Sequence, residues 1–247
     1  MDLETINFKD SELPIAISSC GFLPKGEGKL DTKIFLIDHI LLQTEPELAL
    51  KQLWNSYFTY LKQIIENEPS IEDKLTIFAH NLGNFDGYFL YKGLMSCYQP
   101  DNVTSIIDDS NKFISISCNA ISLTGELIEF KDSLRIFPTS LDKLCEMFAV
   151  KGKLTSYNPN FNNLDLFNNQ NLLQEFINYS LQDAKSLFEA LFNAQNIYFN
   201  KFKVDIESIY STATLSLKFY RAKFQEDPIF ILPSNIDNFI RNSYYIL

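Results

Sequence analysis

Four carboxylates and one tyrosine in this sequence have the types and spacing that metal-dependent chemistry requires. The first two, Asp2 and Glu4, are two residues apart, so both side chains lie on the same side of an extended strand. Carboxylates that close repel each other, and a divalent cation relieves the repulsion. We interpret residues 1–5 as the end of a strand. Taken alone, an exposed and frayed acidic terminus explains this pair more simply.

Asp86 is the third carboxylate, and it follows an apolar strand. The stretch Phe78-Ala79-His80-Asn81-Leu82-Gly83-Asn84-Phe85-Asp86-Gly87-Tyr88-Phe89 joins a strand at 75–78 to a helix that opens near Asp86. A carboxylate at such a junction is well placed for chemistry. It is equally well placed to cap the helix, because Asp binds the free amides of a first turn. Considered locally, the cap is the favoured interpretation.

Asp183 is the fourth carboxylate, within a helix predicted over residues 172–199. Apolar residues three and four apart define its buried stripe, and Asp183 lies in that stripe. A charge there is costly unless it is paired or bound to metal. Tyr179 lies one turn earlier on the same face and can reach the same groups. The alternative is a tolerated boundary Asp beside a core Tyr.

Composition limits the function classes. The chain has 247 residues, of which 46% are hydrophobic, and a formal net charge of −10. This charge argues against a surface for duplex DNA but allows a local groove for a single strand. No apolar run approaches the ~18 residues of a membrane span and no leader opens the chain, so we expect a soluble protein without a membrane partner. The four scattered cysteines suggest core thiols in a reducing compartment.

The order of elements predicts an α/β fold with a mixed central sheet flanked by helices. The expected strands are 14–22, 32–37, 103–107, 113–121 and 126–130, and further helices open near Thr44 and Pro138. His39 is expected to be solvated or packed rather than a ligand. Residues 152–169 form a long Asn-rich loop, either a binding loop or a poorly ordered one. Residues 205–247 resemble a second, small helical unit.

Such a sheet would bring the three acidic sites to one edge. Two divalent ions about 3.5–4 Å apart, Mg²⁺ or Mn²⁺, need a set of hard oxygen ligands of this kind. One ion would generate and orient hydroxide, and the other would stabilise the departing 3′ oxygen of a phosphodiester. Tyr179 suits the task of holding the attacking water better than that of a strong base, since an unperturbed tyrosine has a pKa near 10.

The three sites together resemble the 3′–5′ exonuclease domain of family B DNA polymerases, of the protein-primed type found on linear mitochondrial plasmids. Asp2-Leu3-Glu4 matches the first motif, Asn81 followed by Phe85-Asp86 matches the second, and Tyr179-Ser180-Leu181-Gln182-Asp183 matches the third. Residues 131–135 and 138–144 continue the likeness, which covers nearly the whole chain. The histidine variant of the superfamily has His where this sequence has Asn178, so the tyrosine variant is indicated.

The resemblance implies a ribonuclease H-like fold and a role for each matching residue. The metal ligands would be Asp2, Glu4, Asp86 and Asp183. Tyr179 would position the water, while Asn81 and Phe85 would hold the frayed 3′ end. Ser133 and Leu134 match a contact to single-stranded DNA. A catalytic lysine is expected next, for which Lys151 and Lys153 both qualify and Lys153 is favoured. A terminal protein as partner and residence in the mitochondrion also follow from the family.

The resemblance further divides the chain into an exonuclease domain at 1–204 and the start of a linker at 205–247. The first strand would be truncated, because only Met1 precedes the first motif. We therefore expect that a defective site would fail at Asp2 and Glu4. We expect no nucleotide polymerisation by this chain, since the residues of a polymerase active site are missing from it. The alternatives are an inactive remnant that at most binds single-stranded DNA and a stand-alone exoribonuclease.

Overall fold

Three antiparallel strands open the chain. The computed structural model describes residues 1–22, 29–67, 74–122, 125–152, 157–225 and 233–236. Strand β1 (Asp2–Phe8) pairs with β2 (Ser11–Phe22), and β2 pairs with β3 (Leu30–Leu36). The interpretation of residues 1–5 as the end of a strand is wrong. They begin a seven-residue strand that buries Met1, Leu3 and Ile6, and this burial holds the terminus in place.

A second sheet has four strands in the order β4-β7-β6-β5. Strand β4 (Lys74–Ala79) runs parallel to β7 (Leu127–Asp132), while β6 (Phe113–Cys118) and β5 (Val103–Ile107) add antiparallel strands. The α/β class with a mixed sheet is therefore confirmed, although the sheet is divided in two. The backbone nitrogen of Met1 meets the carbonyl oxygen of Phe78 where the two sheets adjoin.

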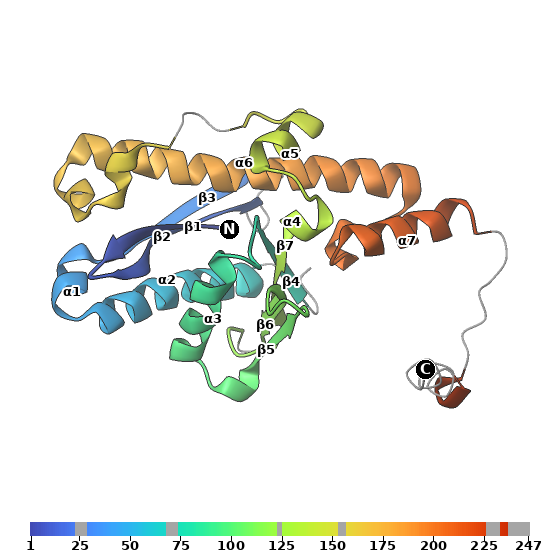
Figure 1. Cartoon of the computed structure of the whole chain (residues 1–247), viewed down its shortest axis with the longest axis horizontal. Helices are drawn as coiled ribbons and strands as arrows, with labels where there is room; N and C mark the ends of the chain where they lie inside the picture. Colours follow the sequence, from blue (N-terminus) through green and yellow to red (C-terminus); the bar gives the residue numbers. More distant parts are fainter. Residues whose placement is uncertain (23–28, 68–73, 123–124, 153–156, 226–232, 237–247) are drawn as a thin grey trace.

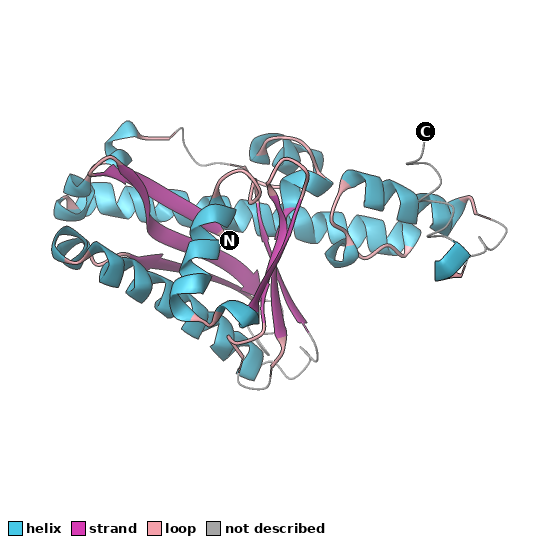
Figure 2. Ribbon diagram, turned by 60° about the horizontal axis from the view of Figure 1, so that its bottom comes forward, coloured by secondary structure: helices cyan, strands magenta, loops and turns pink. Residues whose placement is uncertain are grey.

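Helices cover both faces of the first sheet. The long helix α6 (Gln170–Phe202) packs on β1, β2 and β3, while α2 (Pro46–Asn67) packs on β2 and β3 (Figure 1). The turned view of Figure 2 shows both sheets beside α6. Helix α3 (Asp86–Cys97) contacts α2 and β6. The shorter helices are α1 (His39–Thr44), α4 (Ser133–Ile136), α5 (Leu141–Met147) and α7 (Thr212–Lys223).

Two local expectations are resolved by packing. His39 stacks on Phe167 with ring centroids 4.8 Å apart, which confirms a packed histidine. The expected long loop at 152–169 is only partly a loop. It contains the 3₁₀ helices Pro159–Asn162 and Leu164–Asn168, and Phe161 and Leu166 are buried. Apolar residues spaced through an Asn-rich stretch give these turns an anchor in the core, which the polar composition obscures.

Residues 204–225 pack on the body of the molecule. Val204, Ile206, Ile209 and Leu215 join a buried cluster with side chains of α4, α5 and the second half of α6. Helix α7 contacts α4 and α6. Residues 226–232 and 237–247 of the expected small helical unit lie outside the described residues. Within the described ranges, no helix is long and apolar enough to cross a membrane. The four cysteines are free thiols, and Cys118 and Cys145 are buried.

Candidate functional site

The first predicted motif lies on a strand that is anchored at its start. The amino group of Met1 donates a hydrogen bond of 2.6 Å to the carbonyl oxygen of Phe78, the penultimate residue of β4. Asp2 is paired with Ser18 of β2 and Glu4 with Ala16. Both carboxylates are half-buried, while Leu3 between them points into the core. Alternation along the strand therefore puts Asp2 and Glu4 on the same side, as expected.

The second motif occupies the turn between β4 and α3. Asn81 adopts a φ of 74°, in the left-handed region that few residues other than glycine occupy. Its side-chain oxygen accepts a bond of 2.6 Å from the Asn84 amide. The residue that precedes α3 is Phe85, whose side chain makes no capping hydrogen bond, and Asp86 is the first helical residue. The interpretation of Asp86 as the N-cap is therefore wrong, although Asp86 is an acidic residue in the first turn of α3.

The environment of Asp86 disfavours a lone negative charge. Asp86 is only 4% exposed. Burial raises the pKa of its carboxyl well above the usual range, and the charge of Asp2 raises it further. The Met1 amino group opposes this rise, and Asp132 adds to it. Asp2 and Asp86 therefore interact across the junction of the two sheets. A cation between them would relieve both the burial cost and the repulsion.

The third motif places Tyr179 and Asp183 one turn apart on the buried face of α6. The ring of Tyr179 packs 5.7 Å from that of Phe161 and 6.0 Å from that of Tyr157, measured between centroids. Burial raises the pKa of Tyr157, and the charge of Glu4 raises it further. Glu4, Tyr157 and Tyr179 thus form one neighbourhood. It links the first strand to the long helix.

A cleft of about 650 Å³ connects the three motifs. It receives Asp2 from β1, Asn81 from the turn after β4 and Asp183 from α6. The other lining residues come from the same turn and from the segment around α4 and α5: His80, Leu134, Pro138, Thr139, Ser140, Leu141 and Asp142. One residue from each motif thus lines the same cleft, although the motifs are far apart in the sequence.

The carboxylates suit a divalent cation in type, and they approach in pairs. Asp2 interacts with Asp86 and shares the cleft with Asp183. Hard carboxylate oxygens are the ligands that Mg²⁺ and Mn²⁺ prefer. Among the described residues, no group of three or more His, Cys, Asp or Glu side chains is drawn together as a metal-binding cluster. A bound cation would have to bring Asp183 and the Asp2–Asp86 pair closer to each other.

The residues predicted to contact DNA have different surroundings. Leu134 and Asn81 line the cleft. Ser133 is fully buried, and its hydroxyl donates a bond of 3.1 Å to the carbonyl oxygen of Ala79. Phe85 is half-buried, and its ring lies 5.3 Å from that of Phe89. Ser133 therefore holds the end of β4 with its side chain, while Leu134 presents its own to the cleft.

Of the two candidate lysines, Lys151 lies within the described residues. Lys151 is exposed, and its carbonyl oxygen accepts a bond of 3.0 Å from the hydroxyl of Ser186 on α6. This bond fixes the backbone of Lys151 beside the helix that carries Asp183. Lys153, which was favoured, lies outside the described residues.

Sequence reasoning overlooked three residues of this region. His80 lines the cleft, with its Nε2 atom 2.9 Å from the Thr139 carbonyl oxygen and its Nδ1 atom 3.0 Å from the Ser133 hydroxyl. Tyr157 lies beside Tyr179. Asp132 is buried and accepts backbone hydrogen bonds from the turn that carries Asn81. The signals for Asp132 were its place just after a predicted strand, next to Ser133, and within the stretch 131–135 that continues the family likeness.

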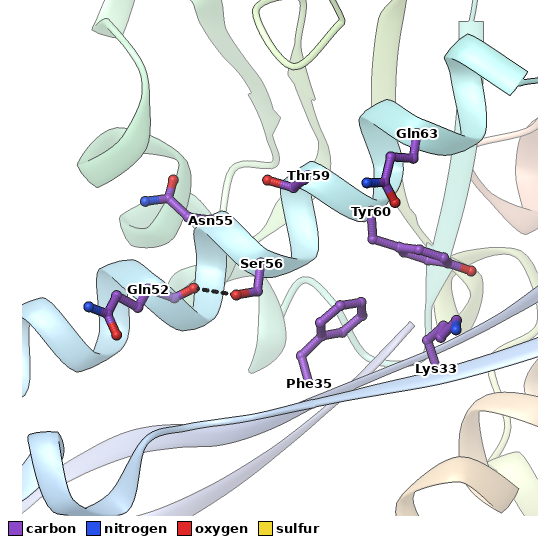
Figure 3. Close-up of a pocket in the computed structure, with 8 residues that line it drawn as sticks. All are labelled: Lys33, Phe35, Gln52, Asn55, Ser56, Thr59, Tyr60 and Gln63. Carbon is purple, nitrogen blue, oxygen red and sulfur yellow. Dashed lines mark hydrogen bonds between the residues drawn. The ribbon is translucent and has the colours of Figure 1, made fainter.

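A second hollow lies away from these motifs, between α2 and β3, with a volume of about 590 Å³. Figure 3 shows its residues: Lys33 and Phe35 from β3, and Gln52, Asn55, Ser56, Thr59, Tyr60 and Gln63 from α2. Amides and hydroxyls dominate this lining. It contains no residue of the three motifs.

Comparison with known proteins identifies the family. Residues 67–164 and 151–245 match the model of the family described as DNA polymerase type B, organellar and viral. A probable DNA polymerase of Agaricus bitorquis is 24% identical over 99% of this chain and 34% of its own length. A probable DNA polymerase of Neurospora intermedia is 24% identical over 70% of this chain and 22% of its own length. The chain thus spans about a third, or less, of these relatives.

Solved structures share the fold. Phi29 DNA polymerase complexed with primer-template DNA and incoming nucleotides superposes with a TM-score of 0.60 and 14% identity, over 97% of this chain and 37% of that one. The same polymerase complexed with single-stranded DNA gives a TM-score of 0.56 and 15% identity, over 97% of this chain and 38% of the other. The mixed α/β fold is therefore shared. The chain belongs to the type B DNA polymerases of organelles and viruses.

Proposed function

We propose that the cleft lined by Asp2 and Asp183 is a 3′–5′ exonuclease site that removes nucleotides from single-stranded DNA. The observation that carries the proposal is the cleft that Asp2, Asn81 and Asp183 line together. Burial and the nearby Asp2 charge raise the pKa of the Asp86 carboxyl, and a site with this charge conflict favours a bound cation. Asp183 reaches the same cleft from α6.

Each residue would have a distinct task in this reaction. Two Mg²⁺ or Mn²⁺ ions, when bound, would supply a hydroxide nucleophile and neutralise charge on the departing 3′ oxygen. Asp2, Glu4, Asp86 and Asp183 would hold them through hard oxygen atoms. Tyr179, buried beside Tyr157, would orient the attacking water through its hydroxyl. The water must approach in line with the bond that breaks.

The strand would enter along the residues that the turns after β4 and β7 contribute to the cleft. Asn81 and Leu134 line the cleft, and Phe85 lies in the same turn as Asn81, where its ring would contact a base. Lys151 or Lys153 would add positive charge near the scissile phosphate. A single strand suits an acidic protein better than a duplex, because its contact is confined to one local groove.

The wider setting of this activity follows from the family. The relatives described as probable DNA polymerases are longer than this chain. Proofreading during protein-primed replication, a terminal protein as partner and residence in the mitochondrion are part of the same proposal. They rest on the organellar and viral family and on the DNA-bound phi29 polymerase neighbours.

Degradation of a 5′-labelled oligonucleotide tests the proposal. With Mg²⁺ or Mn²⁺ the protein should shorten single-stranded DNA one nucleotide at a time from its 3′ end, and it should stop at a 3′ end blocked by phosphorothioate linkages. An RNA oligonucleotide of the same sequence separates an exoribonuclease from a DNA exonuclease. Binding of the DNA strand without any shortening, in either metal, would instead indicate an inactive remnant.

A further inference from the structure

Asp132, at the end of β7, holds together two turns that line the cleft. It is 3% exposed. Its Oδ1 atom accepts backbone hydrogen bonds from Asn81 at 3.0 Å and from Leu134 at 2.9 Å, and its Oδ2 atom accepts one from Gly83 at 2.9 Å. Three N–H groups from two segments of chain therefore converge on one buried carboxylate.

The topology explains why one side chain can reach both turns. Strands β4 and β7 are parallel neighbours, and Ala79 at the end of β4 is paired with Asp132 at the end of β7. The turns that follow them leave the same edge of the sheet. The Ser133 hydroxyl adds a second link by donating to the Ala79 carbonyl oxygen. The relative position of the two turns is thus fixed at this point.

Asn81 has particular need of this restraint. A φ of 74° costs conformational energy for a residue with a side chain, and the surrounding contacts must offset this cost. The hydrogen bond to Asp132 holds its N–H in that conformation. Gly83 completes the arrangement, since an added Cβ would lie 2.6 Å from the Phe113 carbonyl oxygen and 3.2 Å from Oδ2 of Asp132. The turn therefore has one tight conformation, directed at Asp132.

We propose that Asp132 is a positioning residue that sets the distance between Asn81 and Leu134. Through this distance it sets the affinity of the cleft for a DNA strand. This inference rests on the proposed exonuclease function. Asp132 acts through the backbone of both turns. Its role as the N-cap of α4 accounts for the bond to Leu134 but not for the bonds to Asn81 and Gly83.

A carboxylate is needed because all three partners are donors. An asparagine of the same shape would direct its own N–H₂ group at a backbone N–H, and it would leave at least one buried amide without an acceptor. Asp132→Asn is therefore a sharp test, since it changes hydrogen bonding with almost no change in volume. Asp101→Asn, on an exposed 3₁₀ turn, is the matched control.

Amide hydrogen exchange tests, without any substrate, whether Asp132 restrains the turn that carries Asn81. In the Asp132→Asn variant, peptides that cover residues 80–86 should exchange faster than in the wild type, while peptides from α2 and the Asp101→Asn control should be unchanged. Unchanged exchange at residues 80–86 in a folded variant would overturn the inference, because Asp132 would then not restrain this turn.

Kinetics on single-stranded DNA test whether this restraint affects the binding of the strand. Asp132→Asn should raise KM by about tenfold, while kcat stays within about threefold of the wild type, because ground-state strand binding is lost and the metal ligands remain. A wild type that degrades DNA beside a variant with the same KM refutes the inference alone. A wild type that never degrades DNA refutes the proposed function, and fluorescence anisotropy with the same strand then decides whether Asp132→Asn weakens binding. If the variant binds as tightly as the wild type, the inference falls too.

Discussion

The backbone nitrogen of Met1 lies 2.6 Å from the carbonyl oxygen of Phe78. This contact ties the strand that carries Asp2 and Glu4 to the strand that leads into the turn with Asp86. Met1 is also buried, and its sulfur accepts a hydrogen bond from the Tyr57 hydroxyl at 3.5 Å. Asp2 and Glu4 therefore have a structural setting on a paired strand, while the expectation that a defective site would fail at these two residues stays a prediction. The backbone and the side chain of Met1 both anchor the start of β1, and this strand positions the first motif.

Asp86→Asn should stabilise the protein in the absence of divalent metal. The pKa of Asp86 is raised in the folded state, so its favourable contribution exists only while it is protonated and is lost as the pH rises through that folded pKa. At pH 7 the neutral amide removes the cost of a buried charge, and the free energy of unfolding should rise by about 0.5–2 kcal/mol. Urea unfolding with EDTA measures this.

When metal is added, the wild type should become more stable than Asp86→Asn. Mg²⁺ or Mn²⁺ binds only the folded wild type tightly, so it should raise the wild-type free energy of unfolding and leave Asp86→Asn nearly unchanged. The advantage of the variant without metal should also shrink as the pH falls below the folded pKa of Asp86 toward the unfolded value of 3.8. A wild type indifferent to both ions would show that Asp86 is no ligand.

Tyr179→Phe should slow hydrolysis and leave strand binding intact. The substitution keeps the ring that packs against Tyr157 and Phe161 and removes only the hydroxyl. If that hydroxyl orients the attacking water, kcat should fall about 10- to 100-fold at unchanged KM. Tyr220→Phe, on the exposed side of α7, is the control. Equal rates for Tyr179→Phe and the wild type would remove Tyr179 from the mechanism.

Tyr210→Phe should loosen the segment after residue 204 from the sheet. The Tyr210 hydroxyl donates a bond of 2.7 Å to Oε1 of the buried Glu129, and its ring lies 3.9 Å from the Nζ atom of Lys131. Losing a hydrogen bond to a buried carboxylate costs about 1.5–3 kcal/mol of unfolding free energy. Chemical unfolding of this variant and of Tyr220→Phe gives the comparison, and equal stabilities would contradict the role of this contact.

The effect of Tyr210→Phe should depend on pH. Burial alone would raise the pKa of Glu129, but hydrogen bonds from Lys74 and Tyr210 and the charges of Lys131 and Lys74 outweigh it and lower the pKa. A lowered carboxyl pKa contributes stability above the unfolded value of 4.5, and this stability is lost as the pH falls through the folded value. The difference between Tyr210→Phe and the wild type should therefore shrink below about pH 4.5. A constant difference down to acid would assign it to packing.

Gly83→Ala should damage the turn that carries Asn81. The new Cβ would approach the Phe113 carbonyl oxygen to 2.6 Å, and a backbone atom cannot easily give way. We expect a loss of about 1–3 kcal/mol of unfolding free energy, together with weaker DNA binding. Gly21→Ala is the matched control, since nothing lies within 4 Å of its added Cβ. If both variants behave alike, the close packing of this turn is not what shapes the cleft.

Local patterns in the sequence predicted much of this structure. The sequence predicted helices that begin near Thr44, Asp86 and residue 172, close to the starts of α2, α3 and α6, and strands that overlap β2 to β7. Each of these signals lies within a few residues of sequence, so no long-range contact was needed to identify it.

What the sequence did not reveal depends on contacts far apart in the chain. Helix α4 has four residues and owes its start to Asp132, whose other partners lie about 50 residues away. The packing of Tyr210 on Glu129 spans a separation of 81. The burial of Phe161 was concealed by its polar neighbours. None of these contacts leaves a periodic pattern, because each joins single residues from different elements.

The most direct measurement is loss of label from a 3′-labelled single-stranded oligonucleotide, with Mg²⁺ or Mn²⁺, for the wild type, Asp86→Ala and Asp183→Ala. We predict that the wild type releases the label and that each substitution lowers the rate by more than about 100-fold, beyond the usual loss for residues that only support a ligand. Asp101→Ala should retain the wild-type rate. Release that survives both substitutions, or its absence from the wild type in both metals, would contradict an exonuclease site built on these carboxylates.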